Sequence, residues 1–292
     1  MDRPIAVVQT PFMGDINPKC RNASYSDMDK CCHKESESTF LRFCRKHTSS
    51  LPSDCKPWKI ADITLLSCGY FAILDSANIR LKIFNAEFVH ICSKVIPDES
   101  HSLTSLQGEK IYVMDNTSVQ YYRFNDSKTS FEDKFLLTGM HYGICSDGII
   151  LCLVKLTTLV FKNENFDTLR TVNFKSELGY TPANISFDGD SSLVFFNDDS
   201  KCVICWNKHQ EEKWRADGID SCIGIQKFRQ GWIVYGVKEV TFIKNTGKVT
   251  AQSIVEQYFE NLKCIVVDNV KKKLFVSDLK NIYDYDLDLS KI

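Results

Sequence analysis

The most regular feature of the sequence is a short apolar run that recurs about every 40 residues. Six copies end at residues 75, 115, 155, 197, 236 and 278, so successive copies lie 39 to 42 residues apart. Valine, isoleucine, leucine and aromatic residues fill them without polar alternation, which is typical of strands covered on both faces. The six runs are Tyr70–Asp75, Lys110–Asp115, Ile150–Lys155, Leu193–Asn197, Trp232–Gly236 and Leu274–Asp278.

Shorter strand patterns flank every run. A strand and a turn, often with glycine or asparagine, precede each run, and an alternating strand followed by Asn or Asp comes after it. A fourth strand fits the remaining residues of five of the units. Four strands per unit, a period near 40 and the lack of long helical patterns predict an all-β, six-bladed β-propeller with four antiparallel strands per blade. A β-sandwich is the alternative, although it gives no reason for six repeats.

The units divide the chain into a short arm and one domain. We expect residues 1–38 to form a mobile arm or a docking tail, and residues 39–292 to form the propeller. The blades are expected near 60–97, 98–139, 140–176, 177–217, 218–256 and 257–292. The sixth unit ends after its third strand, so an N-terminal strand is expected to complete it, at 39–46. Thr39–Cys44 is the preferred closing strand and Pro4–Val8 the alternative.

Composition restricts the classes of function. The chain has 36 basic and 37 acidic residues, which gives no overall field for attracting nucleic acid or an anionic membrane. Its first residues lack the apolar region typical of a secretory leader, and it has no apolar stretch long enough to span a membrane, so we expect neither export nor a membrane span. Its 13 cysteines are an odd number, which favours free thiols in a reducing compartment. We therefore expect a cytoplasmic protein that binds neither DNA nor membranes.

Ile60–Phe84 resembles the first blade of NHL-type propellers, and more narrowly of those that end tripartite-motif (TRIM) proteins of invertebrates. The family's Asp-x-x-Asn turn is present at Asp75–Asn78 and again at Asp278–Asn281. Blades three and five depart from it, with Lys155 and Gly236 at the Asp position. The resemblance covers residues 40–292 and implies a reader of protein substrates or of RNA, without the RING and coiled coil of the whole ligase.

Two cysteine patterns were considered as metal sites. Cys31, His33, Cys44 and His47 loosely resemble a B-box zinc site, but only the last two keep the spacing of paired zinc ligands. Cys202 and Cys205 form a C-x-x-C pair inside a strand, where residues three apart point to opposite faces. Degenerate linker residues and buried thiols, respectively, are the favoured interpretations, and no cofactor is predicted.

Catalysis and RNA binding have weaker signals. Strand-end acids could hold calcium as in lactonase-type propeller hydrolases, but acids in turns more often cap the backbone. These acids are Asp75, Asp115, Asp198 and Asp278. The basic run Lys271–Lys273 lies in a hairpin turn and is interpreted as a solvated turn rather than an RNA contact.

The predicted function is therefore a non-catalytic interaction module whose partner is a protein, with RNA binding as the first alternative and calcium-dependent hydrolysis as the second. Loops from each outer strand to the next inner strand share a face with the turns between second and third strands, and loops on rigid scaffolds commonly bind partners. That face is expected to gather aromatic and cationic residues. They are Trp58, His101, His141, Tyr180, Lys238 and Lys280.

Overall fold

The computed structural model describes residues 40–48, 50–125, 127–139, 141–155, 157–173, 185–188, 192–237, 239–254 and 262–292. These residues belong to one compact unit. The N-terminal arm expected over residues 1–38 lies outside the described residues and stays a prediction. No helix in the described ranges is long and apolar enough to span a membrane.

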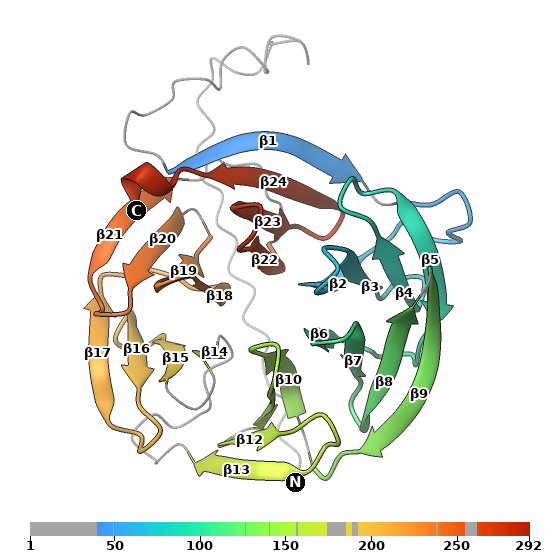
Figure 1. Ribbon diagram of the computed structural model, residues 1–292, viewed down its shortest axis with the longest axis horizontal. Helices are drawn as coiled ribbons and strands as arrows, with labels where there is room; N and C mark the ends of the chain where they lie inside the picture. Colours follow the sequence, from blue (N-terminus) through green and yellow to red (C-terminus); the bar gives the residue numbers. More distant parts are fainter. Residues whose placement is uncertain are drawn as a thin grey trace, which may run out of the picture. The chain divides into compact units, whose positions relative to one another are not determined.

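Six four-stranded antiparallel sheets are arranged around a common centre (Figure 1), and the predicted six-bladed propeller is confirmed. Blade 1 contains β2 (Ile60–Leu65), β3 (Phe71–Asp75), β4 (Arg80–Phe84) and β5 (His90–Val95). Blade 2 contains β6 (Ser102–Leu106), β7 (Lys110–Met114), β8 (Ser118–Asn125) and β9 (Lys128–Leu136). Blade 3 contains β10 (His141–Ser146), β11 (Leu151–Lys155), β12 (Thr158–Lys162) and β13 (Thr168–Asn173).

The remaining blades follow the same order from the inside outward. Blade 4 contains β14 (Ile185–Asp188), β15 (Ser192–Asn197), β16 (Cys202–Trp206) and β17 (Glu212–Asp217). Blade 5 contains β18 (Gly224–Phe228), β19 (Gly231–Tyr235), β20 (Glu239–Lys244) and β21 (Val249–Ile254). Blade 6 contains β22 (Cys264–Asp268), β23 (Lys273–Ser277) and β24 (Asn281–Leu287), followed by the short 3-10 helix η2 (Leu289–Lys291).

An N-terminal strand completes blade 6, as predicted. The strand β1 (Leu41–Thr48) pairs antiparallel with β24 on the rim of the ring (Figure 1). It begins and ends later than the expected Thr39–Cys44, because its pairing continues until Thr48 lies opposite Asn281. The Phe40 side chain just before it is fully buried, and its N–H donates to Ser253 Oγ of blade 5 at 2.9 Å. Closure therefore covers the edge of β24 and ties blade 6 to its neighbour.

The hydrophobic core is divided among the spaces between neighbouring blades. We call each space a junction and name it by its two blades. Strand β3 shows the reason, because Phe71 and Ile73 pack toward blade 6 while Ala72 and Leu74 pack toward blade 2. Alternate residues of a strand face opposite sides of its sheet, so a second strand that serves two junctions has no polar face.

Side chains also join the inner strands of neighbouring blades. Asp62 Oδ2 on β2 accepts hydrogen bonds from the Leu103 N–H at 2.9 Å and from Ser102 Oγ at 3.2 Å, both on β6. Between blades 5 and 6, the Gln226 side chain bonds the backbone of Ile265 and Val267 at 2.9 and 2.8 Å. These contacts satisfy polar groups at the inner edges of the sheets.

Candidate functional site

The structure brings two of the predicted face residues together at the 6–1 junction. Trp58 precedes β2, and its indole Nε1–H donates to the Lys280 carbonyl in the turn between β23 and β24 at 2.6 Å. The ring is only 5% exposed, since it packs with Ile60, Phe71 and other residues of this junction. Trp58 therefore acts as an anchor that fixes the Lys280 turn, and its ring face is not available for stacking on a ligand.

A buried ionic network lies beneath Trp58. The Lys82 side chain is fully buried, and its Nζ lies 2.7 Å from Asp54 Oδ2 and 2.7 Å from Asp75 Oδ2. It also lies 5.7 Å from the centre of the Trp58 ring, within cation-π range. Burial alone raises the pKa of Asp75, but hydrogen bonds from Lys82, the Lys59 N–H and Asn78 outweigh it, so the pKa is lowered. The network holds the segment between β1 and β2 against blade 1.

Three exposed lysines surround this anchor, and we call Lys56, Lys59 and Lys280 the junctional lysines. Each has its backbone fixed by a turn side chain. The Lys56 N–H donates to Asn78 Oδ1 at 3.0 Å, the Lys59 N–H to Asp75 Oδ1 at 3.1 Å and the Lys280 N–H to Asp278 Oδ1 at 2.6 Å.

The charges of the junctional lysines are directed to solvent. Their positions are rigid at the backbone, and within the described residues no carboxylate forms an ion pair with any of the three. The acids nearest in the sequence, Asp54, Asp75 and Asp278, are buried and already engaged. The group therefore presents cationic side chains that an acidic ligand can reach.

The two predicted histidines differ in their surroundings. His101 is partly exposed before β6, and its Nδ1 lies 3.2 Å from the Glu99 carbonyl. His141 at the start of β10 is 7% exposed, and its Nδ1 lies 3.0 Å from the Gly139 carbonyl. Burial lowers the pKa of His141, so its ring is neutral near pH 7 with the proton on the nitrogen that faces the carbonyl. Tyr180 and Lys238 lie outside the described residues.

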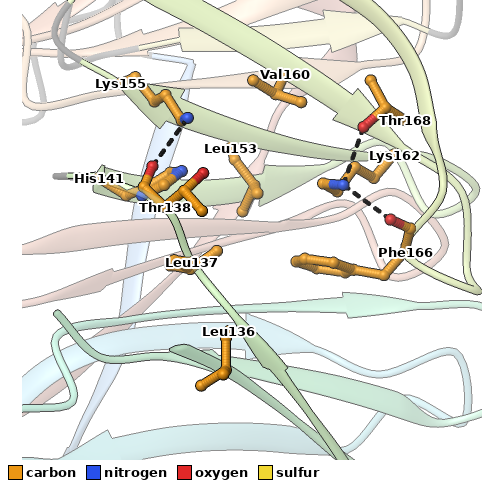
Figure 2. Close-up of a pocket in the computed structure, with 10 residues that line it drawn as sticks. All are labelled: Leu136, Leu137, Thr138, His141, Leu153, Lys155, Val160, Lys162, Phe166 and Thr168. Atoms are coloured by element: carbon orange, nitrogen blue, oxygen red, sulfur yellow. Dashed lines mark hydrogen bonds between the residues drawn. The ribbon is translucent and has the colours of Figure 1, made fainter. Parts of the chain in front are cut away.

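His141 belongs to a cavity at the 2–3 junction. The cavity has a volume of about 190 Å³ and is bordered by the end of β9, the connection to β10, and strands β10 to β13. Figure 2 shows Leu153 near its middle, with His141 and Lys155 on one side and Lys162 and Phe166 on the other. The lining residues are Leu136, Leu137, Thr138, His141, Leu153, Lys155, Val160, Lys162, Phe166 and Thr168.

Within the part of the chain that the structure describes, the two cavity lysines hydrogen-bond to uncharged oxygens. Lys155 Nζ donates to the Thr138 carbonyl at 3.1 Å, and Lys162 Nζ donates to the Phe166 carbonyl at 2.8 Å and to Thr168 Oγ1 at 3.0 Å. An ammonium has three donors, so with respect to the described residues both retain unused capacity. None of the lining residues is acidic.

The strand-end acids of the hydrolase alternative are all engaged in turns or ion pairs. Asp115 Oδ1 accepts from the Thr117 and Ser118 N–H groups at 2.7 Å, and Asp278 Oδ1 accepts from the Lys280 and Asn281 N–H groups at 2.6 Å. Asp198 pairs with Lys201. Asx capping of the turns is therefore the observed role of Asp115 and Asp278.

The zinc candidates that the structure describes have separate partners. Cys44 is exposed, its Sγ lies 3.5 Å from the Arg42 carbonyl, and partial burial raises the thiol pKa. The His47 ring stacks on Phe88 with centroids 3.9 Å apart. Cys31 and His33 lie outside the described residues. Within the described ranges no three His, Cys, Asp or Glu side chains are grouped as metal ligands.

The C-x-x-C pair behaves as two buried thiols. Cys202 packs in the 3–4 junction and Cys205 in the 4–5 junction, because residues three apart in a strand face opposite sides. Neither the cavity nor the Lys82 network is predicted by the pattern of the sequence. A signal for the cavity was present in Lys155, which stands where the runs of blades 1, 2 and 6 end in Asp, but nothing in the pattern placed Lys162 beside it.

Comparison with known proteins identifies the fold. No protein-family model matches the sequence, and no curated protein matches it. Among solved structures, a streptogramin B lyase superposes with a TM-score of 0.61 at 11% identity, covering 83% of this chain and 97% of that one. Virginiamycin B lyase from Staphylococcus aureus gives a TM-score of 0.55 at 12% identity, covering 77% and 79%.

A chain of a mitotic checkpoint complex gives a TM-score of 0.61 at 9% identity, covering 98% of this chain and 99% of that one. At such low identities the likeness is one of fold alone. The fold occurs in lyases and in a chain of a protein complex, so the function of this protein has to be argued from its own residues.

Proposed function

We propose that the protein is a non-catalytic interaction module that binds an acidic segment of a partner protein at the junctional lysines. The observation that carries the proposal is the exposure of Lys56, Lys59 and Lys280 at one junction, with fixed backbones and without an acidic partner among the described residues. A rigid group of like charges attracts an oppositely charged segment and loses little backbone entropy on binding it.

Two further points support a role as a reader of protein substrates. The Asp-x-x-Asn turns that resemble those of TRIM-type NHL propellers include both turns of this site, Asp75–Asn78 and Asp278–Asn281. The propeller in the mitotic checkpoint complex is also a chain of a protein assembly. The odd count of 13 cysteines supports work in the reducing cytoplasm.

RNA is the second candidate, because phosphates also bind lysines. Recognition of single-stranded RNA relies on bases stacked on exposed aromatic rings. The Trp58 ring, which lies beside the lysines, is buried and hydrogen-bonded. The basic turn Lys271–Lys273 is partly neutralised, since Lys273 pairs with Asp284 and Asp286. These features favour an acidic protein segment over RNA.

Charge reversal tests the proposal. The triple variant Lys56→Glu, Lys59→Glu, Lys280→Glu is compared with Lys208→Glu, Lys244→Glu, Lys248→Glu, which makes the same change of charge on exposed lysines in or next to the turns between third and fourth strands. Fluorescence anisotropy measures binding of an oligo-glutamate peptide and of an oligouridylate, and cross-linking from cytosol is performed with and without nuclease.

We expect the first variant to weaken peptide binding by at least about tenfold, equal to 1.4 kcal/mol, and to lose its cross-linked proteins, while the control retains both. Nuclease is expected to leave the cross-linked set unchanged. Equal losses in both variants would contradict the site, and loss of all partners on nuclease treatment would establish RNA as the ligand.

A further inference from the structure

We propose that the cavity at the 2–3 junction is a binding site for a small organic carboxylate whose body is one ring or a branched aliphatic group. The site is independent of the junctional lysines, because it lies between different blades and shares none of their residues. The proposal combines the origin of the cavity, its charge and its size.

The cavity exists because small or flexible residues replace the large ones of the blade repeat. Ile60 pairs with Asp75 in blade 1, and His141 pairs with Lys155 at the equivalent place in blade 3. Trp58 and Gly139 each lie two residues before these positions, so Gly139 corresponds to Trp58. Gly139 has φ +82° and nothing within 4 Å of the position that a Cβ would occupy. The Trp58 indole fills space at the 6–1 junction. At the 2–3 junction the corresponding residue is Gly139, so no side chain fills the equivalent space.

A second replacement widens the space and adds charge. Phe84 pairs with Phe71 in blade 1, and Lys162 pairs with Leu151 in blade 3. The buried phenyl ring of Phe84 is thus replaced by a lysine whose ammonium lies 4.6 Å from the centre of the Phe166 ring. Burial and the charge of Lys155 both lower the pKa of Lys162, while Asp167 raises it.

The cavity has a lysine on either side of Leu153, which suits an anion. Lys155 and Lys162 lie close enough for their charges to interact, and within the described residues neither has a carboxylate within ion-pair distance. Asp167, the acid that acts on Lys162, is exposed and accepts a hydrogen bond from Asn163 Nδ2 at 3.1 Å. A bound carboxylate would accept from the unused ammonium donors and relieve their mutual repulsion.

The remaining lining indicates an organic ligand. Leu137, Leu153, Val160 and Phe166 contribute apolar surface, which would strip an inorganic phosphate of its hydration without replacing it. A dry cavity of about 150 Å³ in another protein holds benzene. The volume here, about 190 Å³, therefore accommodates one ring with a carboxylate, and benzoate is the simplest probe.

Calorimetric titration with benzoate tests the site in the 292-residue chain. The charge-removing variant is Lys155→Met with Lys162→Met, and the matched control is Lys128→Met with Lys134→Met, two exposed lysines of β9 that do not line the cavity. Val160→Leu keeps both charges and reduces the space. Circular dichroism confirms that each variant is folded, and benzamide and inorganic phosphate serve as comparison ligands.

We expect saturable benzoate binding to the wild type and to the β9 control. Benzoate should bind the cavity variant and Val160→Leu at least about tenfold more weakly, and benzamide should bind the wild type at least about tenfold more weakly than benzoate does. Absence of saturable binding to the wild type, equal binding of benzamide or phosphate, or equal loss in the β9 control would each overturn the proposal. A glutamate-containing peptide is titrated in parallel. Binding of this peptide without benzoate binding would reject a free small molecule in favour of a protein carboxylate.

Discussion

The 6–1 and 2–3 junctions are built from equivalent strands but differ in how they are filled. At the 6–1 junction the Trp58 and Phe84 rings are almost completely buried. At the 2–3 junction Gly139 and Lys162 hold the corresponding positions, and a cavity of about 190 Å³ lies there. A common backbone repeat therefore does not determine whether a junction is solid or hollow, because that depends on the residues at a few positions.

The charges differ in the same way. Lys82 in the third strand of blade 1 meets Asp75 at the end of the second strand. In blade 3 Val160 stands in place of Lys82, so the buried cation is lost, and Lys155 stands in place of Asp75, so a cation replaces the acid. One junction thus neutralises its charge internally, whereas the other leaves cationic groups without an acidic partner among the described residues.

The two junctions nevertheless share an aromatic clamp at the turns between third and fourth strands. Phe88 in blade 1 and Phe166 in blade 3 both have left-handed backbones, with φ values of 59° and 67°. Phe88 stacks on His47 of β1, and Phe166 stacks on Phe135 of β9 at 4.3 Å. Equivalent clamps show that the cavity is a local feature of an otherwise intact junction, and not the result of displaced blades.

Removing β1 is expected to have the largest effect on this comparison. Deletion of residues 1–48 takes away the pairing partner of β24, the buried Phe40 and the His47 ring, so blade 6 keeps an open edge. We expect aggregation and loss of the cooperative thermal transition, measured by size-exclusion chromatography and circular dichroism. Deletion of residues 1–38 serves as the control and is expected to retain a monomeric, folded propeller. A monomer with wild-type melting behaviour after the longer deletion would show that closure is dispensable.

The next largest difference is expected in the free energy of unfolding when one lysine is replaced at each junction. Lys82→Met leaves Asp54 and Asp75 buried without their cation, which is expected to cost about 3–5 kcal/mol in the free energy of unfolding. Lys162→Met removes a half-buried cation bonded to neutral oxygens, and we expect a cost below about 1 kcal/mol. Urea unfolding measures both, and equal costs would remove the distinction between the junctions.

The pH dependence of the same pair of variants provides a second readout. The native pKa of Asp75 is lowered, so its contribution to stability is present above the pKa of the unfolded chain and is lost as the pH falls through the native pKa. Without Lys82 the burial of Asp75 dominates and raises its native pKa, so this acid loss should disappear and stability should instead fall as the pH rises through the native pKa. Lys162→Met is expected to leave the acid limb of the stability curve unchanged.

A smaller difference is expected at the inner strands, where Asp62 of blade 1 corresponds to Gly143 of blade 3. Burial raises the pKa of Asp62 to about 6, despite hydrogen bonds from Leu103 and Ser102. A raised native pKa means that the neutral carboxyl fits the folded state, so its contribution to stability is full below about pH 4 and is lost as the pH rises to about 6.

Asp62→Asn keeps a neutral side chain of the same shape, so we expect it to remove about 3 kcal/mol of this pH-dependent loss. Urea unfolding of both proteins between pH 4 and pH 7 gives the difference in slope. Parallel curves for the two proteins would show that Asp62 is ionised throughout this range.

The sequence by itself determined the number of blades, the order of strands and the manner of closure. Apolar runs such as Lys110–Asp115 have no polar face because each second strand serves two junctions, and this requirement is visible without coordinates. The face residues were also placed on loops from the repeat alone, and Trp58 and Lys280 proved to be neighbours.

Only the tertiary structure decided what those residues do. The burial of Trp58, the pairing of Lys82 with two acids and the hollow beside Lys162 each depend on residues from different strands or from the preceding segment. The spacing of apolar residues shows which face of a strand is buried, because residues two apart in a strand lie on the same face. It does not report how completely the covering side chains fill the space, because packing is a property of all the side chains that meet there.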